Sequence, residues 1–195
     1  WGVTLVGMGI IPGLYFMTQW LPSYLTQAWN IPYNQALGDR LVLISFCQDL
    51  GMWLGGGAVM WMARGGGSPL QARRVVIVVA YLLMMAMMGL RIAPSINTAV
   101  ALLCCYVFGL GAWLACQQAF KQDVARGRVA TVVGFVGFAE TILSAFVVDR
   151  IGTMAQQTGG FTAVFALFGG LFTFSLIMVF IFMRSRWLDP SAGRR

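Results

Sequence analysis

The chain has 195 residues, of which 59% are hydrophobic and only 10% are charged, and its mean hydropathy is +0.78. A water-soluble domain carries about 25% charged residues, so this composition excludes an ordinary soluble protein and indicates a membrane protein. The formal net charge is +7 and histidine is absent from the sequence. Catalytic triads and metal sites that depend on histidine are therefore excluded.

Six apolar segments follow one another along the chain, and most of them reach the roughly 20 residues that a helix needs to cross a bilayer. The third is short unless it extends to Arg73 or Arg91, whose long side chains can reach the membrane surface. The stretches between segments are rich in Gly, Pro, Asn or charged residues, which is typical of loops. The sequence therefore predicts an all-α membrane protein with six transmembrane helices near 2–27, 41–62, 75–90, 97–120, 129–148 and 161–183.

The basic residues are distributed unevenly over the alternating loops. If the loop after the second segment faces the cytoplasm, ten basic residues share that side: Arg64, Arg73, Arg74, Lys121, Arg126, Arg128, Arg184, Arg186, Arg194 and Arg195. Only Arg40, Arg91 and Arg150 lie on the other side. The positive-inside rule then places both ends of the six-helix unit 1–187, and the tail 188–195, in the cytoplasm. The same distribution explains the net positive charge without a nucleic-acid partner.

Polar residues divide the six segments into two similar groups of three. The first segment carries Tyr15 and Gln19, the second carries Asp49, and the third is almost uniformly apolar. The fourth carries Gln117, the fifth carries Glu140, and the sixth is again apolar. Because three is odd, two such units cross the membrane in opposite senses, and the pattern predicts a 3+3 inverted repeat. We expect the third and sixth helices to face lipid and the others to face a polar cavity.

Four side chains are candidates for binding a substrate. Tyr15 and Gln19 lie one turn apart in the first segment, and Trp113 and Gln117 lie along one stripe of the fourth. A stripe that mixes aromatic and hydrogen-bonding groups is expected where a polar ligand is held, so we expect this face to be open to the cavity. The alternative is that these amides and rings hold the helices together.

Asp49 and Glu140 each lie near the middle of a predicted helix, where an ionised carboxylate costs roughly 2.5–3.5 kcal/mol. The sequence places no Lys or Arg at the same depth, and a carboxyl without a partner charge in a low-dielectric setting is readily protonated. Both are therefore candidates for proton or cation coupling, and the alternative is a structural hydrogen bond. Glu140 is the stronger candidate, because it shares a face with Gly137 and Ser144, which leaves room for water.

Glycine, proline and cysteine suggest packing rather than chemistry. The pair Gly51 and Gly55 has the spacing of closely packed membrane helices, and Pro12 and Pro22 are expected to kink the first helix. The four cysteines all lie in apolar segments without CxxC spacing, which is typical of small buried side chains. We therefore expect neither a metal site nor a cofactor.

Several motifs resemble one known family in their order and spacing. They are "WLPSYL" at 20–25, "LGMWLGGG" at 50–57, "FGLGAW" at 108–113 and "QDVARGRVATVVGFVGF" at 122–138. Together they resemble the C-terminal six-helix half of the anion:cation symporter family of the major facilitator superfamily, over nearly the whole chain. The chain departs from the family at Trp61, which stands where an aspartate is usual, at Gly137, which stands where sugar-acid members carry Asn, and at Gln117, which stands where they carry Trp.

The resemblance implies a secondary transporter, not an enzyme, that moves a small carboxylate-bearing organic anion together with protons or another cation. It implies a bacterial inner-membrane protein. It also implies an N-terminal six-helix half, which in the family carries the anion-binding Arg and the main protonation site. A non-transporting membrane sensor or assembly protein on the same fold is the alternative.

Overall fold

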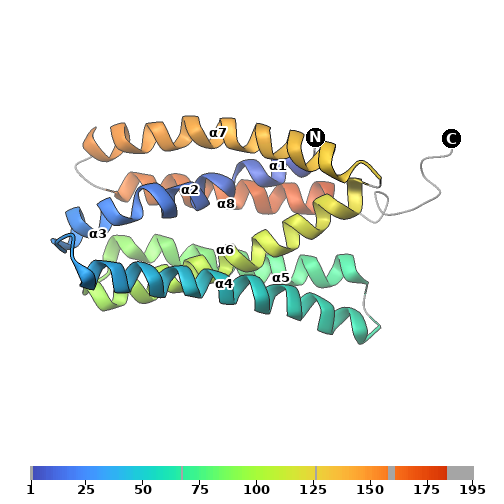
Figure 1. Ribbon diagram of the computed structural model, residues 1–195, viewed down its shortest axis with the longest axis horizontal. Helices are drawn as coiled ribbons and strands as arrows, with labels where there is room; N and C mark the ends of the chain where they lie inside the picture. The colour runs from blue at the N-terminus through green and yellow to red at the C-terminus, as the bar shows by residue number, and fades with distance from the viewer. Residues whose placement is uncertain (1, 67, 126, 158–160, 184–195) are drawn as a thin grey trace.

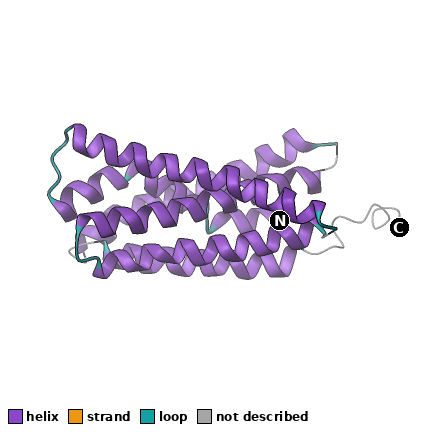
Figure 2. Ribbon diagram, turned by 90° about the horizontal axis from the view of Figure 1, so that it is seen from below, coloured by secondary structure: helices purple, strands orange, loops and turns teal. Residues whose placement is uncertain are grey.

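The computed structural model describes residues 2–66, 68–125, 127–157 and 161–183, and within them the chain is helical with short connections and no strand (Figure 2). Six stretches of this part are long and apolar enough to cross a membrane: Gly2–Gln19, Gln35–Arg64, Pro69–Ile92, Ile96–Ala125, Val129–Ala155 and Thr162–Phe182. The chain is therefore an all-α membrane protein, as its composition predicts. The expected tail, 188–195, lies outside the described residues.

The first predicted segment forms three short helices rather than one. They are α1 (Gly2–Met8), α2 (Ile11–Gln19) and α3 (Leu21–Trp29). Pro12 and Pro22 lie in the first turns of α2 and α3, where proline is tolerated because those positions need no backbone N–H donor. Each proline leaves a preceding carbonyl without its usual partner, so the helix breaks there, and the predicted kinks are confirmed.

The remaining elements are α4 (Gln35–Arg64), α5 (Pro69–Met84), the 3-10 helix η1 (Met85–Ile92), α6 (Ile96–Ala125), α7 (Val129–Gln157) and α8 (Thr162–Phe182). The third span begins earlier than predicted and continues through Arg91 as η1, which gives it the length to cross the bilayer. Asn34 starts α4, because its side-chain oxygen accepts a hydrogen bond from the Leu37 N–H at 3.3 Å.

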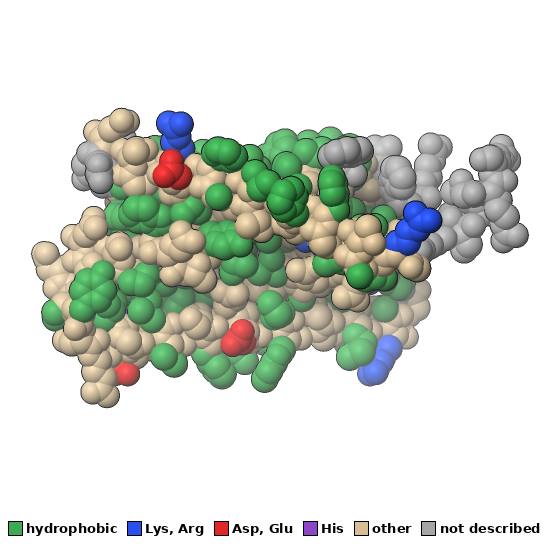
Figure 3. All heavy atoms as spheres, turned by 45° about the horizontal axis from the view of Figure 1, so that its top comes forward, with side chains coloured by type: hydrophobic (Ala, Val, Ile, Leu, Met, Phe, Trp, Pro, Cys, Tyr) green, Lys and Arg blue, Asp and Glu red, His purple; other side chains and the backbone are tan. Residues whose placement is uncertain are grey.

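The helices run side by side along the long axis of the molecule, with α7 and α4 at opposite edges of the view in Figure 1. The central element is α6, which packs against α4, α5 and η1. In its apolar 18-residue stretch, 67% of the residues are buried. The corresponding buried share is only 17% for α4 and 22% for α7. Figure 3 shows one face of the molecule, where hydrophobic and uncharged atoms predominate and charged side chains are few. These two spans are the least buried of the six, and most of their residues are available for contact with lipid or another protein.

An aromatic cluster joins the first span to α8. The Phe16 ring of α2 packs edge-on against Phe165 and Phe168, with ring centroids 6.2 and 5.3 Å apart. Further along, the ring of Tyr24 packs in the same way against Phe165 at 5.4 Å. These edge-to-face contacts add to the hydrophobic burial and hold α2 and α3 against α8, and α2 also packs against α7.

Glycine allows α4 and α6 to approach closely. A Cβ atom placed on Gly51 would collide with the backbone carbonyl of Phe108, and one on Gly55 would lie 2.7 Å from the Ala112 Cβ. The close packing predicted from the glycine spacing is confirmed at this pair of helices.

A Gly51→Val substitution is expected to destabilise the protein by about 1–3 kcal/mol or more, because the new side chain meets backbone that cannot move aside. Thermal unfolding of the purified protein in detergent measures the loss. The matched control is Gly56→Val on the same helix, since a Cβ at Gly56 meets nothing within 4 Å. Equal melting temperatures for the two variants would show that α4 and α6 do not pack as described.

Candidate functional site

A cavity of about 780 Å³ lies between the first span and α7. It is lined by Tyr15, Gln19, Trp20, Ser23, Thr141, Ser144, Ala145, Val148, Asp149, Gly152 and Thr153. The volume falls in the range of sites for small ligands, and the lining combines two aromatic rings with an amide and several hydroxyl groups. The candidates Tyr15 and Gln19 are therefore brought together at a cavity. Its lining comes from α2, α3, α7 and the residue between α2 and α3, whereas α5 and α8 contribute nothing to it.

Trp113 and Gln117 do not lie at this cavity. Trp113 is 0% exposed and Gln117 is 2% exposed, so the expectation that the four candidates share one open face is wrong for these two. The reason is the central position of α6, which is covered by the backbone of α1. A Cβ on Gly7 of α1 would lie 2.5 Å from the Gln117 side-chain nitrogen.

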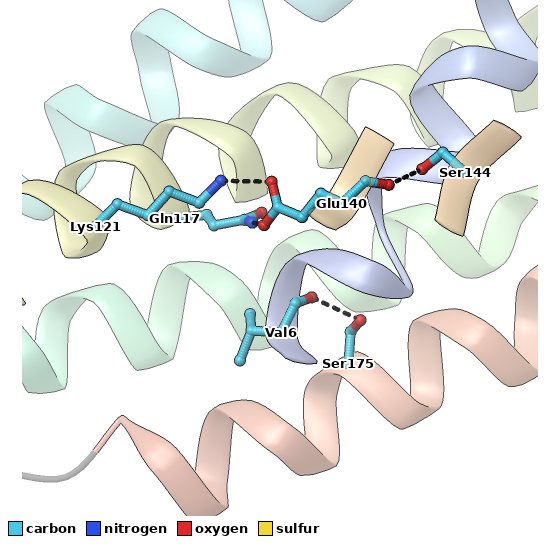
Figure 4. Close-up of polar contacts among 6 residues, drawn as sticks. All are labelled: Val6, Gln117, Lys121, Glu140, Ser144 and Ser175. Carbon is cyan, nitrogen blue, oxygen red and sulfur yellow. Dashed lines mark hydrogen bonds and ion pairs between the residues drawn. The ribbon is translucent and has the colours of Figure 1, made fainter. Parts of the chain in front are cut away.

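Glu140 has a cationic partner, contrary to the expectation from the sequence. The Lys121 Nζ lies 2.7 Å from Glu140 Oε2, and the Gln117 amide nitrogen donates a hydrogen bond to Glu140 Oε1 at 2.9 Å (Figure 4). The Lys121 and Glu140 side chains are 2% and 3% exposed. The three residues form what we call the α6–α7 charge cluster, defined as Gln117, Lys121 and Glu140.

Lys121 was expected in a loop because it begins the charged run "KQD". In the structure α6 continues as a helix to Ala125, and Lys121 lies one turn beyond Gln117 on the same buried face. The spacing of Trp113, Gln117 and Lys121, four residues each, is the signal that could have placed the lysine on that stripe. Four of the ten basic residues assigned to the cytoplasmic side therefore lie within helices: Arg64 ends α4, Arg73 and Arg74 lie in α5, and Lys121 lies in α6. Lys121 is the fully buried one among these four.

The break between α1 and α2 lies beside this cluster. The Ile10 N–H donates to the Gly7 carbonyl, and the Val6 carbonyl instead accepts a hydrogen bond from the buried Ser175 hydroxyl of α8 at 2.8 Å (Figure 4). Gly7 has no side chain, and a Cβ there would overlap the Glu140 carboxylate. The unwound backbone of the first span is thus stabilised by Ser175, which sequence patterns did not single out, and packs directly on the charge cluster.

Three buried polar atoms of α6 have no hydrogen-bond partner within the described part of the chain: the Tyr106 hydroxyl, Trp113 Nε1 and Gln117 Oε1. Such a group costs about 1–3 kcal/mol when it is left unsatisfied. The Tyr106 hydroxyl lies next to the α2 backbone, because a Cβ on Gly13 would be 2.6 Å from it. The stripe of α6 that faces the first span therefore holds unused hydrogen-bonding capacity.

Asp49 lies away from this cluster, on an exposed face of α4. Its neighbours on that face, Phe46 and Trp53, are 55% and 73% exposed. The structure therefore does not bring Asp49 together with Glu140, and the tryptophan one turn away does not cover the carboxylate. The exposed carboxylate lies in the middle of a membrane-spanning helix.

No protein-family profile matches the chain. It is 23% identical over 196 residues to the "Probable L-galactonate transporter" of Escherichia coli (strain K12), which covers 97% of this chain and 42% of that protein. It is 28% identical over 177 residues to the "Hexuronate transporter" of Bacillus subtilis (strain 168), which covers 88% of this chain and 41% of that protein.

The chain is thus similar to two proteins that are named as transporters. It spans about two fifths of the length of these curated relatives. Both relatives are transporters and neither is an enzyme, which agrees with the prediction that this chain is not an enzyme.

Proposed function

We propose that this chain is the C-terminal six-helix half of a secondary active transporter that moves a small organic anion of the sugar-acid class together with protons or another cation. The cavity of about 780 Å³ beside Tyr15 and Gln19 carries this proposal, together with the similarity to the two sugar-acid transporters. A sugar acid has several hydroxyl groups, which the amide, hydroxyl and aromatic lining can bind, and one carboxylate.

The exposed surface supports a partner unit. An ionised Asp49 in contact with hydrocarbon would be costly, yet it lies on an exposed face of α4, the least buried of the six spans. We propose that a second six-helix unit covers this face and closes the cavity. The 3+3 inverted repeat and the contact of α5 and α8 with lipid belong to the same proposal; the exposed side chains of α5 include Val75, Val79 and Leu82.

Asp49 and Glu140 have different places in this proposal. Glu140 lies beside the cavity wall, since Ser144 and Thr141 of the same helix line the cavity, and it is the first candidate for carrying the coupling proton. Asp49 faces the proposed second unit and is the second candidate. Trp113 and Gln117 stay substrate candidates that become accessible only when the first span moves.

The proposed location is a bacterial inner membrane with the C-terminus in the cytoplasm. Without Lys121, nine arginines still fall on the proposed cytoplasmic side and three on the other, so the positive-inside rule keeps its direction.

In a full-length variant from which every cysteine has been removed, Ser68→Cys is expected to react with an impermeant maleimide only in inside-out vesicles. A cysteine at Ser95, which precedes α6 on the opposite side, is expected to react in intact cells. Both positions are exposed. The reverse pattern would show that the unit is inserted the other way round.

The function is tested by uptake into cells that produce the full-length protein. We expect labelled L-galactonate or a hexuronate to accumulate above the level in cells without the protein, whereas the neutral sugar L-galactose is not taken up. Binding of a sugar acid without accumulation would support the sensor alternative instead. Neither binding nor uptake of any sugar acid would reject the proposal.

A further inference from the structure

The position of Lys121 points to an ion-pair exchange. We propose that Lys121 binds the carboxylate of the transported anion, that this carboxylate displaces Glu140, and that the released Glu140 takes up the coupling proton. This inference rests on the proposed function and adds a residue and a mechanism to it.

The part of the cavity that this chain lines offers no positive charge to an anion. Among the described residues that line it, the one charged side chain is Asp149, which repels a carboxylate. Lys121 would therefore be this half's own positive group for the anion, in addition to the Arg that the resemblance places in the second half. Lys121 is the one basic side chain of the described residues that is fully buried. Its partner Glu140 lies one turn of α7 from Ser144, whose hydroxyl donates a hydrogen bond to the Glu140 backbone carbonyl at 2.7 Å (Figure 4). Because Ser144 lines the cavity, the charge cluster is one helical turn from the cavity wall.

In the described part of the molecule, some hydrogen-bonding groups in and beside the charge cluster are still free, and an exchange of ion-pair partners needs such groups to receive the substrate. A lysine ammonium has three N–H donors, and the acceptor recorded for Lys121 in the described part of the chain is Glu140 Oε2. Gln117 Oε1 and Trp113 Nε1 on the same stripe have no hydrogen-bond partner among the residues that the structure describes. A buried pair that served only stability would need its remaining hydrogen-bonding groups satisfied. Substrate hydroxyl groups would complete these bonds while its carboxylate pairs with Lys121.

The first span supplies the movable part. The helix is interrupted between α1 and α2, and the Gly7 backbone lies directly over the Glu140 carboxylate. A shift at this interruption would open the cluster to the cavity without unfolding either helix. The Ser175 hydroxyl holds the free Val6 carbonyl in the present state, so the interruption is stable when closed.

The charges and the proton balance over the exchange. In the closed state the Lys121 cation and the Glu140 anion neutralise each other. When the substrate carboxylate pairs with Lys121, Glu140 loses its counter-charge and takes one proton from water that enters with the substrate. When the substrate leaves, Glu140 releases that proton and pairs with Lys121 again. One anion thus enters the cluster with one proton, and no covalent bond changes.

The groups that face Glu140 support this assignment. From α6 it meets Lys121 and Gln117, and from α1 it meets the Gly7 backbone. From α2, Tyr15 lines the adjoining cavity, and Asp149 of α7 lies more than two turns further along the same helix. Among the described residues, Lys121 is therefore the charged group that decides whether Glu140 holds a proton.

The test compares the full-length wild type with the double variant Lys121→Gln/Glu140→Gln, whose two amides can still hydrogen-bond to each other. In proteoliposomes with an inward proton gradient, we expect kcat/KM for labelled L-galactonate, or for a hexuronate if that is the better substrate, to fall by about 100-fold or more, since a buried charged partner is lost. Calorimetric titration in buffers of different ionisation enthalpy should show about one proton fewer taken up per anion bound than in the wild type.

The matched control is Arg73→Gln/Asp123→Asn, which removes the partly exposed ion pair between α5 and the same end of α6 and should leave uptake at the wild-type level. If the variant Lys121→Gln/Glu140→Gln does not fold, Lys121→Met/Glu140→Met takes its place, and the same fall in kcat/KM is expected. Wild-type uptake by the double variant, with unchanged proton uptake, would overturn the exchange and leave the proposed function standing. No sugar-acid uptake or binding by the wild type would overturn the proposed function itself.

Discussion

A single Lys121→Gln substitution is expected to lower the free energy of unfolding by about 3–5 kcal/mol, because it leaves the Glu140 carboxylate buried without its counter-charge. Glu140→Gln should have an effect of the same size, since the lysine is then the uncompensated charge. Chemical denaturation of the purified protein in detergent measures both. In the double variant most of the loss should be recovered, because no unpaired charge remains.

The partly exposed ion pair between Arg73 and Asp123 is the control for this prediction. The Arg73 and Asp123 side chains are 12% and 42% exposed, so water reaches the Asp123 carboxylate, and ion pairs open to water contribute about 0–1 kcal/mol. Arg73→Gln should therefore lower stability much less than Lys121→Gln. Single variants of Lys121 and Glu140 that unfold like the wild type would show that the two side chains are not buried against each other.

Filling the cavity should reduce uptake at least about tenfold, because small misplacements of a bound substrate are costly. Ala145 lines the cavity and its side chain has room to grow into it, so Ala145→Phe occupies part of the space between α7 and the first span. Initial rates of sugar-acid uptake into proteoliposomes measure the effect.

The same substitution at Ala130, near the start of α7 and outside the cavity lining, is the matched control and should leave uptake nearly unchanged. Both variants must show the melting temperature of the wild type. If Ala145→Phe transports at the wild-type rate, this cavity does not hold the substrate, and the site has to be sought on another face.

Features governed by local sequence could be predicted well. Long apolar runs specify the six spans, because each must satisfy its backbone within the membrane. Pro12 and Pro22 break the first span at the positions where each lacks an N–H donor. Gly51 and Gly55 specify a close contact because nothing larger fits. In each case the residue type itself imposes the constraint.

Features that depend on packing between distant segments could not be predicted. The run "KQD" is as polar as a loop, yet α6 continues as a helix to Ala125, and Lys121 is buried on it as the partner of Glu140 on α7. The partner of the Val6 carbonyl is Ser175, 169 positions away, and a lone serine in an apolar helix gives no sign of it. Trp113 and Gln117 have the spacing of a ligand-binding stripe, but the same spacing serves a buried face.

The placement of acidic residues illustrates the difference between position and environment. Asp49 and Glu140 occupy equivalent positions in the two groups of three segments, yet one is exposed on α4 and the other is paired inside the unit. Their shared position is a property of sequence order, whereas their surroundings follow from which neighbours cover each helix. The different surroundings are the basis for assigning them different roles.

The central claim, that these helices form half of a proton-coupled carrier of sugar acids, is tested most directly with the full-length protein in sealed proteoliposomes. With an inward proton gradient, labelled L-galactonate or hexuronate should accumulate above its external concentration, and a protonophore should abolish the accumulation. Sugar-acid entry that only equilibrates, whether or not the proton gradient is present, would contradict it.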